Sequence, residues 1–172
     1  MKKLLAILLA GAMMFALTGC FGGSSYQVKN ATSDEEAADI SAKDYKKDFD
    51  GLQQYLLDKG YIYKFLYDEN NTEKPRQAMT SEVYADVIGA NDGIRYYFPD
   101  GKSFIEIYDY SGKQNDTAKE VLAEIKENGK FKPIEAGDEL TGVISESGKY
   151  LIIYNPKNKY DYDKITDELK NW

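Results

Sequence analysis

The chain has 172 residues and a formal net charge of −7, from 22 lysines and arginines against 29 aspartates and glutamates. This length suits one globular domain. The acidity argues against nucleic-acid binding, which needs a basic surface, and against flat docking on anionic lipid. The chain has no histidine and a single cysteine, Cys20, which excludes Ser-His-Asp catalysis and histidine-ligated zinc. We predict no cofactor, because the sequence has neither a G-x-G-x-x-G loop nor a Walker pattern.

The first twenty residues have the layout of an export signal, with two lysines, an apolar stretch over 4–17 and then small residues before a cysteine. The apolar stretch is shorter than the roughly 20 residues that a membrane-spanning helix needs. The tetrapeptide LTGC at 17–20 resembles the lipobox of bacterial lipoproteins, whose cysteine receives a diacylglyceryl group before signal peptidase II cuts in front of it. The resemblance implies a signal peptide at 1–19 and a lipid on Cys20. The alternatives are a plain secretory signal with an incidental cysteine, and an N-terminal membrane helix.

Residues 20–39 are predicted to be the lipidated cysteine and a flexible tether, because this stretch is small and polar with little to bury. Residues 40–172 are predicted to form a single α+β domain, which has no cysteine and therefore no disulfide. The lipid on Cys20 would hold this domain at the outer face of the cell membrane. The membrane is thus the expected partner, bound through the N-terminal diacylglyceryl cysteine.

The first half of the domain is predicted to contain two helices and one strand. Helical spacing of apolar residues indicates a first helix from Ala42 to Lys59, with Ser41 as its N-cap and Gly60 as its stop. The apolar stripe of this helix comprises Tyr45, Phe49, Leu52 and Leu56. The next segments are predicted to be a strand at Tyr61–Tyr67, a polar loop at Asp68–Arg76 and a short helix within Met79–Ala90 that ends at Gly89.

The second half is predicted to contain two β-hairpins, each followed by a helix. Pro99-Asp100-Gly101 is a turn motif, since proline presets φ and glycine accepts positive φ, and Gly148 marks the second turn. The predicted strands are Ile94–Phe98, Ser103–Tyr110, Phe131–Glu135, Val143–Ser145 and Tyr150–Tyr154. The predicted helices are Thr117–Asn128, with a capping box of Thr117 and Glu120, core-facing Val121, Leu122 and Ile125 and a stop at Gly129, and Tyr162–Trp172, capped by Asp161.

The two hairpins also resemble each other. Phe104–Tyr108 matches Tyr150–Tyr154 without a gap, and each of these strands lies between a glycine turn and a helix. We therefore predict a repeated β-hairpin–helix unit, against the alternative of a chance similarity between two short strands. Such a repeat would place both hairpins in one antiparallel sheet and both helices on one face, which gives a two-layer α+β fold.

Strand alternation within this repeat predicts two different sheet faces. The face that carries the repeat helices would have Ile105, Ile107, Leu151 and Ile153. The candidate ligand-binding residues form the opposite, aromatic face and are Phe104, Tyr108, Tyr110, Tyr150 and Tyr154. Five aromatic side chains on one face are either covered, here by the first helix, or form an open platform for a peptide, a glycan or a partner protein.

Carboxylates, tyrosines and lysines are the groups that remain for catalysis, and two carboxylates suffice for glycoside hydrolysis. With 29 acidic residues some will lie close together, so composition identifies no such pair, and we predict no catalytic residue. Acidic clusters at Asp68–Asn71 and at Asp161 with Asp163 lack the spacing of a calcium loop, so we predict no metal site.

The full pattern resembles small, lipobox-bearing lipoproteins of Gram-positive, gut-type bacteria. The shared features are the lipobox, the Gly/Ser tether, the segment 48–52 and the segment 147–150 before an apolar strand. We interpret the chain as a membrane-anchored extracytoplasmic lipoprotein, a non-catalytic binding or accessory module for a protein or small ligand that the sequence does not name. The alternatives are a small carboxylate-based glycan hydrolase and a structural partner of a membrane complex.

Overall fold

The structure of the chain is a computed structural model. It describes residues 26–27, 34–68, 71–81, 84–132, 139–158 and 160–172. The predicted signal peptide at 1–19 and the lipidated Cys20 lie outside these residues and stay predictions. Within the predicted tether, the structure forms a two-residue strand and the short helix α1 (Asp34–Asp39), in which Ala37 is buried.

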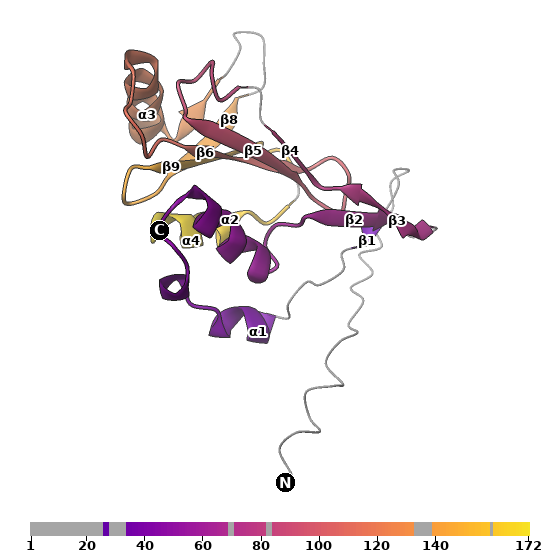
Figure 1. The fold of residues 1–172 in the computed structure, drawn as a ribbon. Helices are drawn as coiled ribbons and strands as arrows, with labels where there is room; N and C mark the ends of the chain where they lie inside the picture. The colour runs from indigo at the N-terminus through magenta and orange to yellow at the C-terminus, as the bar shows by residue number, and fades with distance from the viewer. Residues whose placement is uncertain (1–25, 28–33, 69–70, 82–83, 133–138, 159) are drawn as a thin grey trace.

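The described residues form an α+β fold with two antiparallel sheets, which confirms the predicted fold class. The larger, six-stranded sheet has the order β4-β5-β6-β9-β8-β7, and the smaller sheet has the order β1-β2-β3 and projects beyond one end of the larger one (Figure 1). The strands are β1 (Tyr26–Gln27), β2 (Phe65–Asp68), β3 (Asn71–Gln77), β4 (Met79–Ser81), β5 (Asp92–Tyr97), β6 (Phe104–Asp109), β7 (Lys130–Phe131), β8 (Leu140–Ile144) and β9 (Tyr150–Tyr154). The longer helices are α2 (Phe49–Asp58), α3 (Asp116–Asn128) and α4 (Asp163–Lys170).

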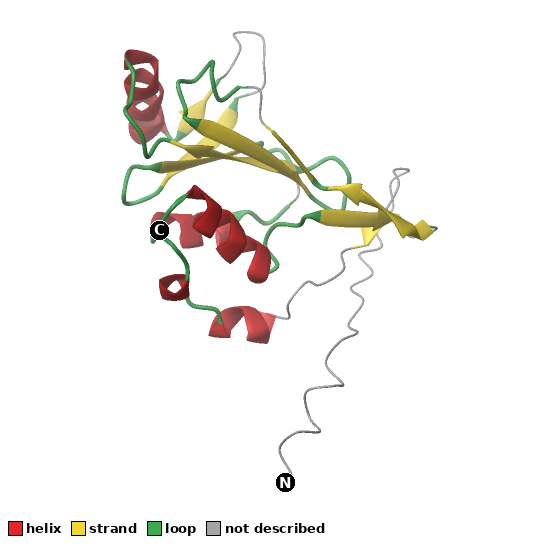
Figure 2. Ribbon diagram, viewed as in Figure 1, coloured by secondary structure: helices red, strands yellow, loops and turns green. Residues whose placement is uncertain are grey.

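Helices cover both faces of the larger sheet (Figure 2). On one side, which we call the α3 face, Ile125 of α3 packs in a core with Leu151. On the other, the α2/α4 face, Leu52 of α2 and Leu169 of α4 pack in a core with Ile152. The two helices that follow the hairpins therefore lie on opposite faces, and the prediction that they share one face is wrong.

The register of the central strand pair explains this arrangement. Ile107 of β6 lies opposite Ile152 of β9, so each cross-strand pair joins an odd-numbered residue to an even-numbered one. Paired residues of antiparallel strands project to the same face. Ile107 and Ile153, which match in the sequence repeat, therefore project to opposite faces. The face that a side chain occupies follows from the pairing register, which the sequence match does not contain.

The two predicted hairpins of the second half are confirmed. Gly101 and Gly148 have φ of 68° and 69°, in the left-handed region that their turns require. In the first turn, Asp100 Oδ1 accepts a hydrogen bond from the backbone N–H of Ser103 at 2.7 Å. Local turn chemistry thus favours both hairpins. The predicted strand at Phe131–Glu135 is observed only as β7, and 133–138 lie outside the described residues.

Helix α3 ends at Gly129 as predicted, with φ of 66°. Its N-terminus differs from the prediction, because Asn115 rather than Thr117 is the N-cap. Asn115 Oδ1 accepts from the backbone N–H of Ala118 at 2.8 Å. An asparagine side chain caps as well as a threonine does, so the helix gains its earlier start without the capping box. Helix α4 begins at Asp163, one residue after the predicted start.

The predicted first helix is divided into two elements. Ser41 caps only a 3₁₀ turn over Ala42–Asp44, after which the chain is extended at Tyr45. Helix α2 then begins at Phe49, with Asp48 as its N-cap. The second N-cap, Asp48, therefore starts a new helix within the segment that the apolar spacing predicts as one helix. The 3₁₀ turn and α2 keep the predicted stripe together, since its members all contact the same core.

Two predictions for the middle of the chain are wrong. The predicted polar loop at Asp68–Arg76 contains most of strand β3, and the predicted helix within Met79–Ala90 is strand β4 followed by turns. Pairing with distant strands overrides the local composition here. Ala78 joins the two sheets, because its N–H donates to the Lys64 carbonyl and its carbonyl accepts from the Tyr97 N–H, at 2.8 and 2.7 Å. Pro75 is tolerated because β3 is an edge strand.

Among the described residues, none of the helices has the length and apolar character needed to cross a membrane.

Candidate functional site

The five candidate aromatic residues do not share a face, so the predicted aromatic platform is wrong. The strand register places Tyr150 and Tyr154 on the α2/α4 face, and Phe104, Tyr108 and Tyr110 on the α3 face. Likewise, Ile105 and Ile107 lie on the α2/α4 face, whereas Leu151 and Ile153 lie on the α3 face.

Three of these aromatic side chains are core residues. The side chains of Tyr108, Tyr110 and Tyr150 are buried. Tyr110 Oη donates to the Ile88 carbonyl at 3.1 Å, so its polar end is satisfied inside the protein. Phe49 of α2 stacks on Tyr150 with ring centroids 6.4 Å apart, which is the covering role predicted for the first helix. The candidate site must therefore lie elsewhere.

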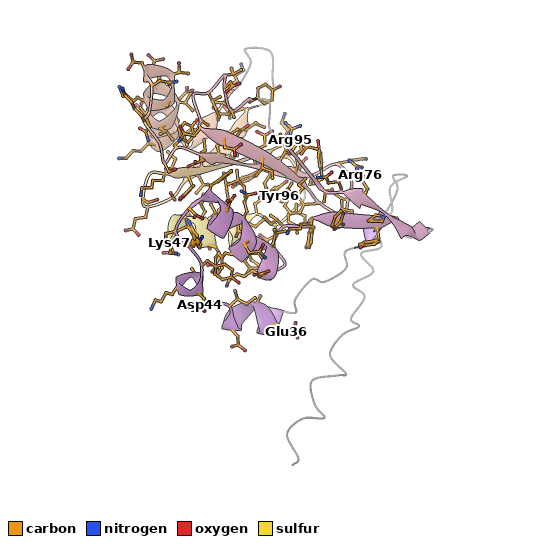
Figure 3. All side chains as sticks on the ribbon, viewed as in Figure 1. Glu36, Asp44, Lys47, Arg76, Arg95 and Tyr96 are labelled. Carbon is orange, nitrogen blue, oxygen red and sulfur yellow. The ribbon has the colours of Figure 1, made fainter. Side chains whose placement is uncertain are left out.

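A buried carboxylate lies on the α3 face at the pair between β5 and β6. Glu106 stands directly opposite Arg95, and its side chain is only 3% exposed against 23% for Arg95. Arg95 Nε donates to Glu106 Oε1 at 2.9 Å, with a second contact from Nη2, while Tyr108 Oη donates to Oε2 at 2.7 Å. The Arg95 guanidinium also lies over the Phe104 ring, 4.4 Å from its centroid. Figure 3 shows Arg95 on the side of the sheet opposite to Tyr96, which is directed toward α2.

Both carboxylate oxygens of Glu106 thus accept hydrogen bonds within the sheet. Such a carboxylate holds its neighbours in place, and neither oxygen is directed into either of the two grooves described below. The sequence carries one signal for this cluster, which is the acidic Glu106 between Ile105 and Ile107 of the same strand. Strand alternation alone would assign Glu106 to a solvent-exposed face.

An open groove of about 760 Å³ lies between α3 and the outer edge of the larger sheet. Its volume is within the range of ligand pockets. The residues that line it come from the loop before α3, from α3, β8 and the end of α4, and from the hairpin turn. They are Gln114, Leu122, Ala123, Ile125, Lys126, Gly142, Val143, Ile144, Ser145, Glu146, Ser147, Gly148 and Lys170. We call it the α3/β8 groove.

Close packing of α3 on β8 forms one wall of this groove. A Cβ at Gly142 would lie 2.8 Å from Ile125 Cγ2, so glycine allows the helix to approach the strand. Ile125 is buried, whereas Leu122 and Ile144 are each partly exposed beside it. The groove therefore has apolar side chains on both the helix and the strand.

At the strand edge in the groove, the backbone N–H and C=O of one residue of β8 point away from the neighbouring strand β9. Ser145 N–H donates to the Tyr150 carbonyl at 2.9 Å, so Ser145 points toward β9. Gly142 N–H points the other way, to the Gly129 carbonyl at 3.1 Å. Backbone direction alternates along a strand, so the N–H and C=O of Ile144 also point away from β9. Among the described residues, β7 pairs with β8 only at Leu140 and Thr141.

Charged side chains of both signs surround the α3/β8 groove, since Lys170 is ion-paired with Asp167 at 2.8 Å. Lys126 from α3 and Lys170 at the end of α4 are exposed, and Glu146 is the one carboxylate among the described lining residues. A hydrogen bond to Asp167 raises the pKa of Lys170 above its usual range, so this lysine stays protonated. The Lys170 carbonyl accepts from the Glu146 N–H at 3.0 Å, which fixes the end of α4 against the hairpin turn.

A second groove of about 220 Å³ lies between α2 and the β4–β5 edge. Tyr96 Oη donates to Gln53 Oε1 at 2.7 Å across it. Burial, followed by the charge of Asp50, raises the pKa of Tyr96, so its hydroxyl stays neutral. Asp50 is the one carboxylate among the described residues that line this groove. Its small size and internal hydrogen bond make it the weaker candidate.

Among the described residues, no group of three or more potential metal ligands comes together. Compared with protein-family models, with curated proteins and with solved structures, the chain gives no significant match. The groove therefore has to be interpreted from its own geometry. Its residues were not predicted, because Leu122, Ile144 and Lys170 are far apart in the sequence and only the tertiary fold brings them together.

Proposed function

We propose that the chain is a lipid-anchored, extracytoplasmic binding module, held at the outer face of the cell membrane through Cys20, and that its ligand binds in the α3/β8 groove. The lipobox at 17–20 supports the anchor. The observation that carries the binding function is the outward-facing backbone of Ile144, to which the pairing of β7 with β8 does not extend among the described residues, beside partly exposed apolar residues of a helix.

The geometry favours binding over hydrolysis as the role of this groove. A glycoside hydrolase of the two-carboxylate type needs both acids on either side of its substrate. Among the described residues that line the α3/β8 groove, Glu146 is the one carboxylate. The groove also has two lysines and a backbone edge. These groups can position and hold a ligand by hydrogen bonds and charge.

One preparation tests both parts of the proposal. The full-length gene is expressed in a Gram-positive host, and the protein is extracted from membranes with detergent. Mass spectrometry of the N-terminal peptide is expected to show a diacylglyceryl group on Cys20 and the loss of residues 1–19. A chain whose residues 1–20 are replaced by a plain secretory signal is expected in the medium. An unmodified Cys20, or membrane retention of the secreted variant, would contradict the anchor.

The same lipidated protein is then screened by thermal shift against peptides, glycans and polyamines. A ligand present at about 100 times its dissociation constant stabilises a protein by roughly 2.7 kcal/mol. Leu122→Lys is expected to abolish the shift, because Leu122 lines the groove. Lys102→Glu, at the turn on the opposite end of the sheet, is the control and is expected to keep it. A ligand whose shift survives Leu122→Lys would place binding outside the groove.

A further inference from the structure

We propose that one face of the smaller sheet, which carries Phe65, Pro75 and Gln77, lies against the lipid bilayer that anchors the chain. We call it the β2/β3 face. This inference rests on the proposed function, since it needs the lipid on Cys20, and it adds a contact between the folded domain and the membrane. It is carried by the short chain between the anchor and the smaller sheet, by the exposure of this face, and by the charge of its segment.

The chain between the anchor and the smaller sheet is short. Tyr26, the first residue of β1, comes six residues after Cys20 and pairs with Asp68 of β2. An extended chain spans at most about 3.6 Å per residue, so β1 starts within about 22 Å of the lipidated cysteine. The anchor therefore holds the smaller sheet next to the bilayer. Figure 1 shows this sheet at the end of the molecule opposite to α3.

The β2/β3 face exposes apolar side chains. Phe65 pairs with Gln77, and paired residues of antiparallel strands project to the same face. Pro75 lies two residues before Gln77 in β3 and therefore projects the same way. Phe65 is 48% exposed, and Pro75 and Gln77 are exposed beside it, whereas Leu66 on the opposite face is buried. An aromatic ring that folding leaves in water is stabilised by moving into the interface of a bilayer.

The charge of this segment permits contact with lipid. Residues 64–77 contain three basic and three acidic residues, so their formal charge is zero, against −7 for the whole chain. The exposed side chains next to Phe65 and Gln77 in the sequence include Lys64 and Arg76. Anionic headgroups repel the acidic remainder of the domain. The domain is therefore expected to stand on the β2/β3 face rather than to lie flat on the membrane.

This orientation determines where the α3/β8 groove lies. The smaller sheet joins the larger one at Ala78, beside the edge strand β4, whereas the groove lies near the other edge. A domain that stands on the β2/β3 face therefore holds the groove away from the bilayer, where a ligand in solution can reach it.

The first test labels introduced cysteines in lipidated protein that has been added to preformed phosphatidylglycerol vesicles. Cys20 is the one cysteine of the chain and would carry the lipid on its sulfur, so an introduced cysteine is the only free thiol. Gln77→Cys probes the β2/β3 face. Val87→Cys is the control, since Val87 is 61% exposed and lies two residues before Gly89, which packs against Asn115 at the start of α3. A membrane-impermeant maleimide is expected to label Val87→Cys and to lose its reaction with Gln77→Cys.

The second test measures contact of the β2/β3 face with lipid directly. Phe65→Trp and Val87→Trp each add one tryptophan to the Trp172 of the wild type. In vesicles whose acyl chains carry bromine close to the headgroup, Phe65→Trp is expected to lose most of its added emission by quenching. Val87→Trp is expected to keep its added emission, because this side chain would lie in water.

Equal labelling of Gln77→Cys and Val87→Cys on vesicles, or equal quenching of the two tryptophan variants, would overturn this inference. Protection of Gln77→Cys in the secreted variant, which has no lipid, would also overturn it, because protein rather than lipid would then cover the face. Flotation separates this failure from failure of the anchor. Protein that floats with the vesicles but reacts at Gln77→Cys refutes the contact alone, whereas protein that stays in solution with an unmodified Cys20 refutes both.

Discussion

At the scale of single residues, Glu106 is a buried carboxylate inside the fold. Its carboxylate is almost fully buried and accepts hydrogen bonds from Arg95 and Tyr108. Burying a charge is costly unless it is paired, and the loss of one partner leaves the other poorly solvated. Arg95 is partly exposed, so water can solvate part of its charge when the carboxylate is removed.

We therefore expect Glu106→Leu to lower the free energy of unfolding by about 2 kcal/mol, less than for a fully buried pair. The double variant Arg95→Met with Glu106→Leu is expected to be more stable than Glu106→Leu alone, because no cation is left beside an apolar side chain. Urea unfolding of the wild type, both single variants and the double variant measures the coupling. Additive effects of the two substitutions would show that the ion pair contributes nothing to stability.

At the scale of elements, the contact of α3 with β8 depends on the absence of a side chain at Gly142. A Cβ there would lie 2.8 Å from Ile125 Cγ2, closer than atoms pack without displacement. This contact sets the distance between the helix and the strand edge, and therefore the width of the α3/β8 groove.

Gly142→Ala is expected to lower the free energy of unfolding by about 1–2 kcal/mol, because it overpacks this contact. Ile125→Ala alone is expected to cost about 2–4 kcal/mol by leaving a cavity. In the double variant the new methyl group occupies part of that cavity, so the combined loss should be smaller than the two single losses together. Urea unfolding of the four proteins checks this, and a strictly additive double variant would contradict the close contact.

The elements also show which parts of the fold the sequence could predict. The hairpins at Gly101 and Gly148 and the stop of α3 at Gly129 follow from local chemistry and were predicted. Strand β3 was not, because its polar sequence becomes a strand only by pairing with β2. The aromatic face was wrong for a similar reason, since one step of register decides whether Tyr150 shares a face with Ile107 or with Tyr108.

At the scale of the whole molecule, many of the 15 tyrosines support the two cores. Burial, then the hydrogen bond and charge of Asp58, raises the pKa of Tyr45 to about 12. Burial also raises the pKa of Tyr96 and Tyr110. The folded protein therefore binds more protons than the unfolded chain, in which tyrosine ionises near pH 10.

This difference predicts a loss of stability in alkali. The free energy of unfolding should be unaffected by these groups below about pH 9, and should fall as the pH rises through about 10 toward 12, because ionised tyrosine favours the unfolded chain. Urea unfolding across this range measures the fall, and tyrosinate absorbance should rise together with unfolding. Tyr45→Phe removes one of the groups, so its stability should fall less steeply. A free energy of unfolding that stays constant to about pH 11 would contradict the raised pKa values of these tyrosines.

The junction at Ala78 has a mechanical consequence for a domain held at one end. Tyr26–Gln27 of β1 is the first described strand, and it pairs with β2 in the smaller sheet. Tension applied from the N-terminal side would be shared between the smaller sheet, through β1, and helix α2, which follows β1 in the chain and packs on the larger sheet. The two sheets themselves meet at the backbone of Ala78, which is hydrogen-bonded on one side to Lys64 and on the other to Tyr97. The α3/β8 groove lies at the edge of the larger sheet opposite to β4, so it is remote from this junction.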